Sequence, residues 1–265
     1  MPLSYAQQFL CVVSGAFVGF SLGLIGGGGS ILAVPLLIYV VGVRQPHLVI
    51  GTTALAVALN AFANLVPHAR RGNIRWRAGW QFALAGGLGA LAGAAFGKRV
   101  DGRALLFLFS LLMLFVAVRM ARPVKIADLA KTPGAGGGRV IGTGFGVGML
   151  AGFFGIGGGF LVVPGLVRST GMGMLEAVGT SLLAVGIFGL TTTVSYAFAG
   201  LVSGLIAVEF LLGGVFGGWA GASAASHIAK KGRLLNYIFS GIVVLVGLYM
   251  AVHYAAAFAG LFGRM

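Results

Sequence analysis

The sequence predicts an all-α polytopic membrane protein made of two inverted repeats. Three observations support this fold class. Of 265 residues, 58% are hydrophobic and only 8% are charged, with a mean hydropathy of +1.03, far from the composition of a soluble domain. A glycine-rich string interrupts an apolar segment at matching places in both halves. Basic residues gather on one side of the expected membrane. We expect each repeat to hold one glycine-broken, re-entrant helical element and three transmembrane helices.

The first repeat is expected within residues 1–120. Its apolar segments are long enough for helices that cross a membrane, which need about 20 residues, if the shorter ones extend at their ends. The first segment is broken at the string Gly26-Gly27-Gly28-Gly29-Ser30, because glycine costs roughly 1 kcal/mol relative to alanine inside a helix. The segments are Phe9–Val41, Leu48–Val66, Ala78–Phe96 and Ala104–Val118.

The second repeat is expected within residues 140–265, after a polar linker over residues 121–139 that carries Arg122, Lys125 and Asp128. Its first segment is broken at Gly155-Ile156-Gly157-Gly158-Gly159. Its apolar segments are Val140–Val167, Ala177–Ala199, Leu205–Ala225 and Leu234–Tyr254.

An internal duplication relates the two halves. Each glycine string leads into a Val-Pro step, and the offset between Pro35 and Pro164 is 164 − 35 = 129. The offset between the Gly-Thr pairs that follow, at Thr52 and Thr180, is 180 − 52 = 128. Paired interruptions at corresponding positions are the best sequence pointer to the binding site of a secondary transporter.

The distribution of basic residues selects the topology. If each broken segment crosses once, the repeats are parallel and the eighteen Lys and Arg residues divide ten to eight. If it folds back or crosses twice, the repeats are inverted and the division is thirteen to five, which the positive-inside rule favours. We therefore expect both termini outside and a cytoplasmic linker. The thirteen are Arg70, Arg71, Arg75, Arg77, Arg119, Arg122, Lys125, Lys131, Arg139, Arg168, Lys230, Lys231 and Arg233.

The glycine strings are the main candidate site. A break at membrane depth survives only where protein or a water-filled cavity surrounds it. The half-helix after each string presents free N–H groups and a positive dipole end, so two such ends that meet form a site for a small anion. The opposing interpretation is that the glycines only permit close packing. The predicted anion-binding glycines are Gly26, Gly27, Gly28, Gly29, Gly155, Gly157, Gly158 and Gly159, together with Ser30.

Side chains on the next helix of each half form a second candidate layer. Hydroxyls at Thr52, Thr53, Thr180 and Ser181 can donate to an oxyanion, although helix capping or a bond back to a carbonyl is an equal alternative. Asn60, Asn64 and His68 are spaced four apart and share one helix face, which can edge a polar pathway. Thr192 belongs to the corresponding helix of the second half.

Several function classes are excluded or disfavoured. The net charge of +14 arises from basic residues scattered between apolar spans, so a nucleic-acid interface is not expected. Cys11 is the only cysteine, and no acid pair, Ser/His arrangement or metal-ligand spacing appears in the spans, so neither an enzyme, a metal nor a cofactor is predicted. Glu176 is expected to stabilise a helix N-terminus. A non-transporting scaffold subunit and an anion channel remain the rivals of a transporter.

The two glycine strings with their Val-Pro steps, and the Gly-Thr-Thr and Gly-Thr-Ser helices that follow, resemble the sulfite exporter TauE/SafE family over nearly the whole chain. The resemblance implies a multi-pass inner-membrane carrier of sulfite, organosulfonates or related anions, with the glycine motifs at 26–30 and 155–159. The four glycines and Ser30 of the first string differ from Ile156 and Gly159 of the second, so unequal half-sites are expected. Coupling to a proton or another ion, the transport direction and the oligomeric state stay open.

Overall fold

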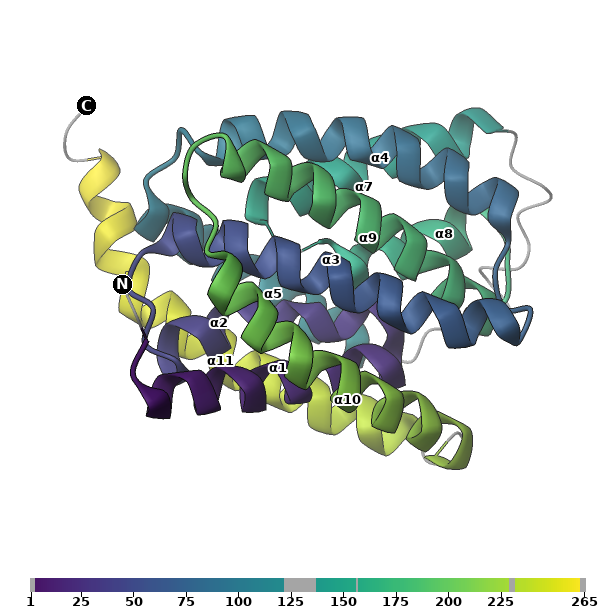
Figure 1. The fold of residues 1–265 in the computed structure, drawn as a ribbon. Helices are drawn as coiled ribbons and strands as arrows, with labels where there is room; N and C mark the ends of the chain where they lie inside the picture. The colour runs from purple at the N-terminus through teal and green to yellow at the C-terminus, as the bar shows by residue number, and fades with distance from the viewer. Residues whose placement is uncertain (1–2, 122–136, 156, 229–231, 263–265) are drawn as a thin grey trace.

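The computed structural model describes residues 3–121, 137–155, 157–228 and 232–262, and every regular element in these ranges is helical. The long helices lie side by side (Figure 1). The first half contains α1 (Tyr5–Ile25), the 3₁₀ helix η1 (Gly26–Leu32), α2 (Ala33–Pro35), the π-helix η2 (Leu36–Val40), α3 (Pro46–Arg70), α4 (Trp76–Gly97) and α5 (Gly102–Ala121). The second half contains α7 (Gly137–Phe154), α8 (Gly159–Thr170), α9 (Met174–Ala197), α10 (Gly204–Ile228) and α11 (Gly232–Phe262).

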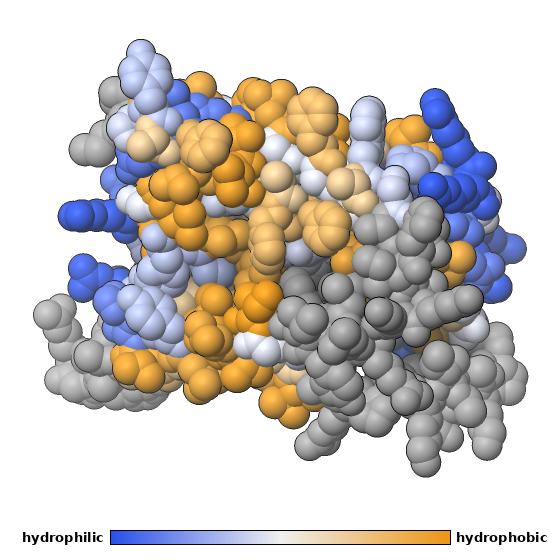
Figure 2. Space-filling model, turned by 90° about the horizontal axis from the view of Figure 1, so that it is seen from below, coloured by the Kyte–Doolittle hydropathy of each residue, from blue (hydrophilic) through white to orange (hydrophobic). Residues whose placement is uncertain are grey.

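The surface suits a lipid environment. Four helical stretches in the described ranges are long and apolar enough to cross a membrane, namely Tyr5–Leu24, Pro46–Arg70, Met174–Ala197 and Gly204–Gly221. Large apolar side chains such as Leu88 and Phe216 are exposed along the helices. Hydrophobic residues cross the middle of the face drawn in Figure 2, and hydrophilic residues lie at its two ends. An apolar belt between polar ends is the pattern of a multi-pass membrane protein.

Both predicted breaks are present, and they differ in conformation. In the first half, α1 ends at Ile25 and the chain continues as the right-handed helix η1. In the second half, Gly155, Gly157 and Gly158 all have φ near +65°, a left-handed region that favours glycine, before α8 begins. The turns that follow match again between the halves. Positive φ recurs at Gly42 and Gly171, and at Gly72 and Gly200.

Contacts between helices establish their relative directions. The side chains of Asn60 and Asn64 on α3 face Gly214 and Gly218 on α10, so α3 and α10 run parallel. By the same test α1 is parallel to α10, α9 is antiparallel to α3, and α4 and α7 are parallel to α9. Because α1 and α3 run in the same direction, the chain returns between them through η1, α2 and η2, as Figure 1 shows.

Two glycine seams, the helix pairs α1 with α10 and α4 with α7, join the halves. At each seam a Cβ added to a glycine would meet a backbone carbonyl oxygen of the facing helix, so the backbones are in direct contact, as expected for small residues in membrane helices. The α1–α10 contacts are Gly15 with Phe210, Gly19 with Gly214, Gly217 with Ala16 and Gly221 with Phe20. The α4–α7 contacts are Gly144 with Phe82, Gly148 with Gly86, Gly89 with Phe145 and Gly93 with Met149.

Candidate functional site

The two broken elements meet. Helix η1, which holds Gly26 to Ser30, packs against α8, which follows the second string, and both contact α9. Gly29 and Ser30 are buried, and a Cβ at Gly29 would collide with the backbone of α1 at Leu22. The first string is therefore held tightly against the helix that precedes it.

The second string lies where equivalent positions of the two halves come together. A Cβ at Gly157 would lie 3.1 Å from Cγ1 of Val57 on α3 and 3.2 Å from Cγ1 of Val185 on α9. These valines are duplicates of each other, since 185 − 57 = 128. Gly155 packs against Ile50, which lies two helical turns before Val57 on α3. The string is thus clamped between the two long helices that follow the breaks.

The N-terminus of α8 is buried and carries no side-chain cap. Its N-cap residue is Gly158, its first turn has no acidic residue, and Gly159 and Phe160 are buried. The first turn of any helix leaves backbone N–H groups without intrahelical partners, and a dipole end equivalent to roughly half a positive charge. A buried helix terminus of this kind is chemically complementary to an anion.

Thr52 and Thr180 make reciprocal contacts between the halves. The Thr52 hydroxyl oxygen accepts a hydrogen bond of 3.0 Å from the backbone N–H of Ser203, just before α10. The Thr180 hydroxyl oxygen accepts one of 3.0 Å from the N–H of Arg75, just before α4. The two donor residues, Arg75 and Ser203, occupy duplicated positions, since 203 − 75 = 128. Each hydroxyl therefore fixes the start of a helix that belongs to the other half.

We expect Thr180→Val and Thr52→Val to lower stability to a similar extent. Each change leaves the N–H of Arg75 or of Ser203 without its partner, which costs about 1 to 3 kcal/mol when the group is buried. Thermal unfolding of the purified protein measures the effect. Thr191→Val is the matched control, because the Thr191 hydroxyl bonds only to the Ile187 carbonyl of its own helix. If Thr191→Val lowered stability as much as the other two changes, the hydroxyls of Thr52 and Thr180 would not stabilise contacts between the halves.

Thr53 and Ser181 bond within their own helices. The Thr53 hydroxyl donates to the carbonyls of Val49 and Ile50 at 2.8 and 3.0 Å, and the Ser181 hydroxyl donates to that of Val178 at 2.7 Å. Thr53 also lies on the face of α3 that bears Ile50 and Val57, because residues three and four apart share a face. Its side chain is thus beside the second string, although its hydroxyl proton is already engaged.

The predicted polar row on α3 faces α10. Asn60 is fully buried, and within the described residues both its amide oxygen and its amide nitrogen have no hydrogen-bond partner. The Asn64 amide donates to the Asn60 carbonyl at 2.9 Å, but its oxygen has no partner there. Thr192, the duplicate of Asn64 on α9, is also fully buried, and its hydroxyl has no hydrogen-bond partner in the described part of the chain. Phe188 replaces Asn60 in the second half, so the halves are unequal at this level.

The interpretation of Glu176 is confirmed. Its carboxylate accepts a hydrogen bond of 3.2 Å from the N–H of Gly173 at the start of α9 and forms an ion pair of 2.9 Å with Arg75. Because both contacts lie at the helix terminus, Glu176 acts there and not in the interior.

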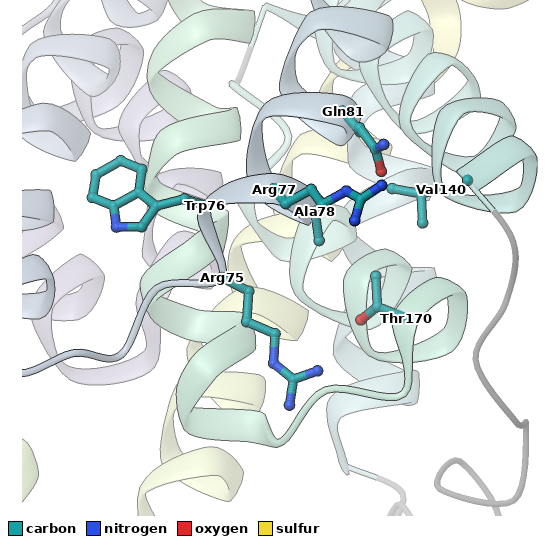
Figure 3. A pocket seen from close by; sticks show the side chains of 8 residues that line it. Arg75, Trp76, Arg77, Ala78, Gln81, Val140 and Thr170 are labelled. Atoms are coloured by element: carbon teal, nitrogen blue, oxygen red, sulfur yellow. The ribbon is translucent and has the colours of Figure 1, made fainter.

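Sequence reasoning missed a pocket of about 520 Å³ at the same end of the molecule. The first turns of α4 and α7 and the last turn of α8 surround it (Figure 3). Arg75, Trp76 and Arg77 are consecutive in the sequence, a combination typical of a membrane interface, and this pattern does not indicate a pocket. The pocket depends on Val140 and Thr170, which are distant in sequence and reach it through the fold.

This fold, with two glycine-broken elements in contact between long apolar helices, defines a multi-pass helical membrane protein. The chain belongs to the sulfite exporter TauE/SafE family, whose sequence profile matches residues 11–250.

Named relatives agree with a transport role. The chain is similar to a "Probable membrane transporter protein" of Xylella fastidiosa, with 49% identity over 251 residues, covering 94% of this chain and 96% of that protein. It is also similar to "Probable membrane transporter protein YunE" of Bacillus subtilis, with 28% identity over 90% of this chain and 95% of that protein. A third relative is "Probable membrane transporter protein MJ0441" of Methanocaldococcus jannaschii, with 25% identity over 91% and 94%. No solved structure matches the chain significantly.

Proposed function

We propose that this protein is a secondary transporter that moves a small anion across the inner membrane by alternating access. The anion is sulfite, an organosulfonate or a related sulfur-containing or organic anion, and it binds at the paired glycine breaks. The buried, uncapped N-terminus of α8 against η1 carries this proposal, because it offers N–H donors without a buried Lys or Arg. Thr53 and Ser181 each lie one helical turn before a valine, Val57 or Val185, that faces Gly157.

Helix directions support an inverted arrangement of the two repeats. Duplicated helices run antiparallel in three pairs, α1 with α7, α3 with α9 and α4 with α10. With an odd number of segments per half, both termini lie outside and the linker lies in the cytoplasm. The basic residues Arg70, Arg75 and Arg139 then share the cytoplasmic end, in agreement with the positive-inside rule.

Within the described residues, the unpartnered amide atoms of α3, both of Asn60 and the oxygen of Asn64, support a conformational change during transport. An amide group buried without partners costs about 1 to 3 kcal/mol, and here the facing residues Gly214 and Gly218 on α10 supply none within the described residues. If α10 moves away from α3 during the cycle, Asn60 and Asn64 gain water or the anion as partners. The row then edges the pathway between the central site and one side of the membrane.

Transport of labelled sulfite and sulfoacetate into proteoliposomes tests the function. We expect saturable flux of at least one anion that empty liposomes lack, together with accelerated exchange when unlabelled anion is present on the opposite side. A scaffold subunit would give no flux. A channel would give flux without accelerated exchange, since alternating access alone couples the two directions.

We expect Thr192→Val to separate function from stability. Valine has nearly the same shape and removes the unpartnered hydroxyl, so stability is unchanged or rises by about 1 kcal/mol, while anion flux falls. Thermal unfolding and proteoliposome flux are measured on the same preparation. Thr193→Val is the matched control, because the Thr193 hydroxyl already donates to the Gly189 carbonyl at 2.8 Å. Equal flux in the two variants would remove Thr192 from the predicted site.

A further inference from the structure

The pocket between α4, α7 and α8 is lined by none of the residues of the two glycine strings. We propose that this pocket binds the oxyanionic group of a ligand, a phosphate or sulfonate, through Arg77, Gln81 and the backbone N–H groups of two helix N-termini. The ligand is either the headgroup of an anionic phospholipid or a soluble organic oxyanion. This inference does not depend on transport through the glycine breaks.

Arg77 is the available cation of the pocket. Arg75 also lines it, but Arg75 forms an ion pair with Glu176, whose negative charge is thereby compensated. Within the described residues Arg77 has no carboxylate partner, and its side chain extends past Gln81 toward Val140 on α7 (Figure 3). A guanidinium group presents a planar set of donors that matches an oxyanion.

Two helix N-termini converge on the same space. The first turn of α4, from Trp76 to Ala78, lines the pocket, and α4 has neither a side-chain cap nor an acidic residue in that turn. Helix α7 begins at Gly137, also in the lining, and has no acidic residue in its first turn. Since neither first turn holds an acidic residue, both helices present positive dipole ends to the pocket that no carboxylate of their own first turns offsets. The amide nitrogen of Gln81 lies 3.8 Å from the position of a Cβ at Gly137, so a donor side chain joins the two termini.

Position and size indicate the ligand. Trp76 and Trp80 are about half exposed on the first turns of α4, the placement of aromatic residues at the level of lipid headgroups. A pocket of about 520 Å³ is larger than sulfite and accommodates a headgroup or an organic sulfonate. Basic pockets between membrane helices are a recognised mode of anionic lipid binding.

The positions that correspond to Arg77 and Gln81 in the second half lack the same chemistry. The offset of 128 places Leu205 at the position of Arg77 and Glu209 at the position of Gln81. A carboxylate there repels an oxyanion. The anion site is therefore a feature of one end of the molecule and is not a consequence of the internal duplication.

Two binding assays on the full-length protein test the proposal and identify the source of the ligand. In nanodiscs of neutral phosphatidylcholine, sulfate is titrated and the thermal unfolding midpoint is followed. In parallel, native mass spectrometry counts phosphatidylglycerol that remains bound after extraction from mixed bilayers. The variants are Arg77→Gln and Gln81→Glu. The control is Arg71→Gln, which removes the same charge from an exposed position at the same end but outside the pocket.

We expect Arg77→Gln and Gln81→Glu to weaken binding about tenfold in at least one assay, while Arg71→Gln stays within about twofold of the parent protein. An effect on sulfate alone identifies a soluble oxyanion, and an effect on phosphatidylglycerol identifies a lipid headgroup. If Arg77→Gln and Arg71→Gln behave alike in both assays, the proposal is overturned. Transport is not a readout here, so loss of flux in another variant leaves this result unchanged.

Discussion

A single methyl group added at Gly148 is expected to destabilise the protein severely, whereas the same change at Gly142 or Gly146 on the same helix is tolerated. A Cβ at Gly148 would collide with the Gly86 carbonyl oxygen on α4. A rigid backbone cannot yield as a flexible side chain can, so α4 and α7 must separate along their seam. We expect a cost at or above the upper end of the range of about 1 to 3 kcal/mol that overpacking produces.

The two control positions make the comparison sharp. Among the residues that the structure describes, no atom lies within 4 Å of a Cβ added at Gly142 or at Gly146. There the alanine gains helix propensity, which stabilises a helix by up to about 1 kcal/mol relative to glycine. In detergent, the thermal unfolding midpoint of Gly148→Ala should therefore lie far below that of the parent protein. The midpoints of Gly142→Ala and Gly146→Ala should equal or exceed it. Equal loss at Gly146 and Gly148 would mean that the seam is not in close contact.

The seam between α1 and α10 allows the same test in the other pair of helices. Gly19 on α1 is the counterpart of Gly148, since 148 − 19 = 129, and a Cβ there would meet the carbonyl oxygen of Gly214 on α10. Gly19→Ala should consequently reproduce the loss. A tolerated change at Gly19 would contradict equal packing of the two seams.

The breaks and the helices around them could be predicted from the sequence, because glycine runs and apolar segments act locally. Gly29 and Gly158 each belong to a break because glycine is a poor helix former. The exchange of partners between halves could not be predicted in this way. Thr52 bonds Ser203 across 151 residues of sequence, and a hydroxyl pattern alone does not reveal a partner so distant.

For the candidate site, the sequence likewise predicts some residues but not the residues that they contact. The row of Asn60 and Asn64 was visible from its spacing, but its neighbour was not, because glycines on α10 have no side chain to indicate a contact. The Arg77 pocket was not visible at all, since it exists only where the ends of three helices meet. Local chemistry is encoded in the sequence pattern, whereas the walls of a site come from tertiary packing.

Gly157→Ala is expected to abolish anion flux while leaving protein that can be purified. Two physical effects act at this position. The φ of +65° is strained for alanine, a cost of about 1 to 2 kcal/mol. The added Cβ also lies 3.1 and 3.2 Å from the Cγ1 atoms of Val57 and Val185, so these side chains must shift by a few tenths of an ångström. Neither effect is large enough to unfold a stable protein, but both move the backbone N–H groups that precede α8.

The double variant Gly157→Ala with Val185→Ala separates these effects. Truncation of Val185 removes one of the two close contacts of the new Cβ and gives it space on that side, but it leaves the φ at residue 157 unfavourable for alanine. If the backbone geometry before α8 binds the anion, flux stays absent in the double variant, and anions that stabilise the parent protein against heat no longer do so. The single change Val185→Ala is the control for the cavity, which costs stability by itself.

Recovery of flux in the double variant would mean that the glycine is required only for close packing. That outcome would mean that the second string serves helix packing, and that the N-terminus of α8 does not bind the proposed anion. Persistent loss of flux, with a folded protein and with normal transport in Val185→Ala, would instead assign the requirement to the conformation of the chain at Gly157. Because Val57 and Val185 are duplicates, Gly157→Ala with Val57→Ala repeats the test from the other half of the molecule.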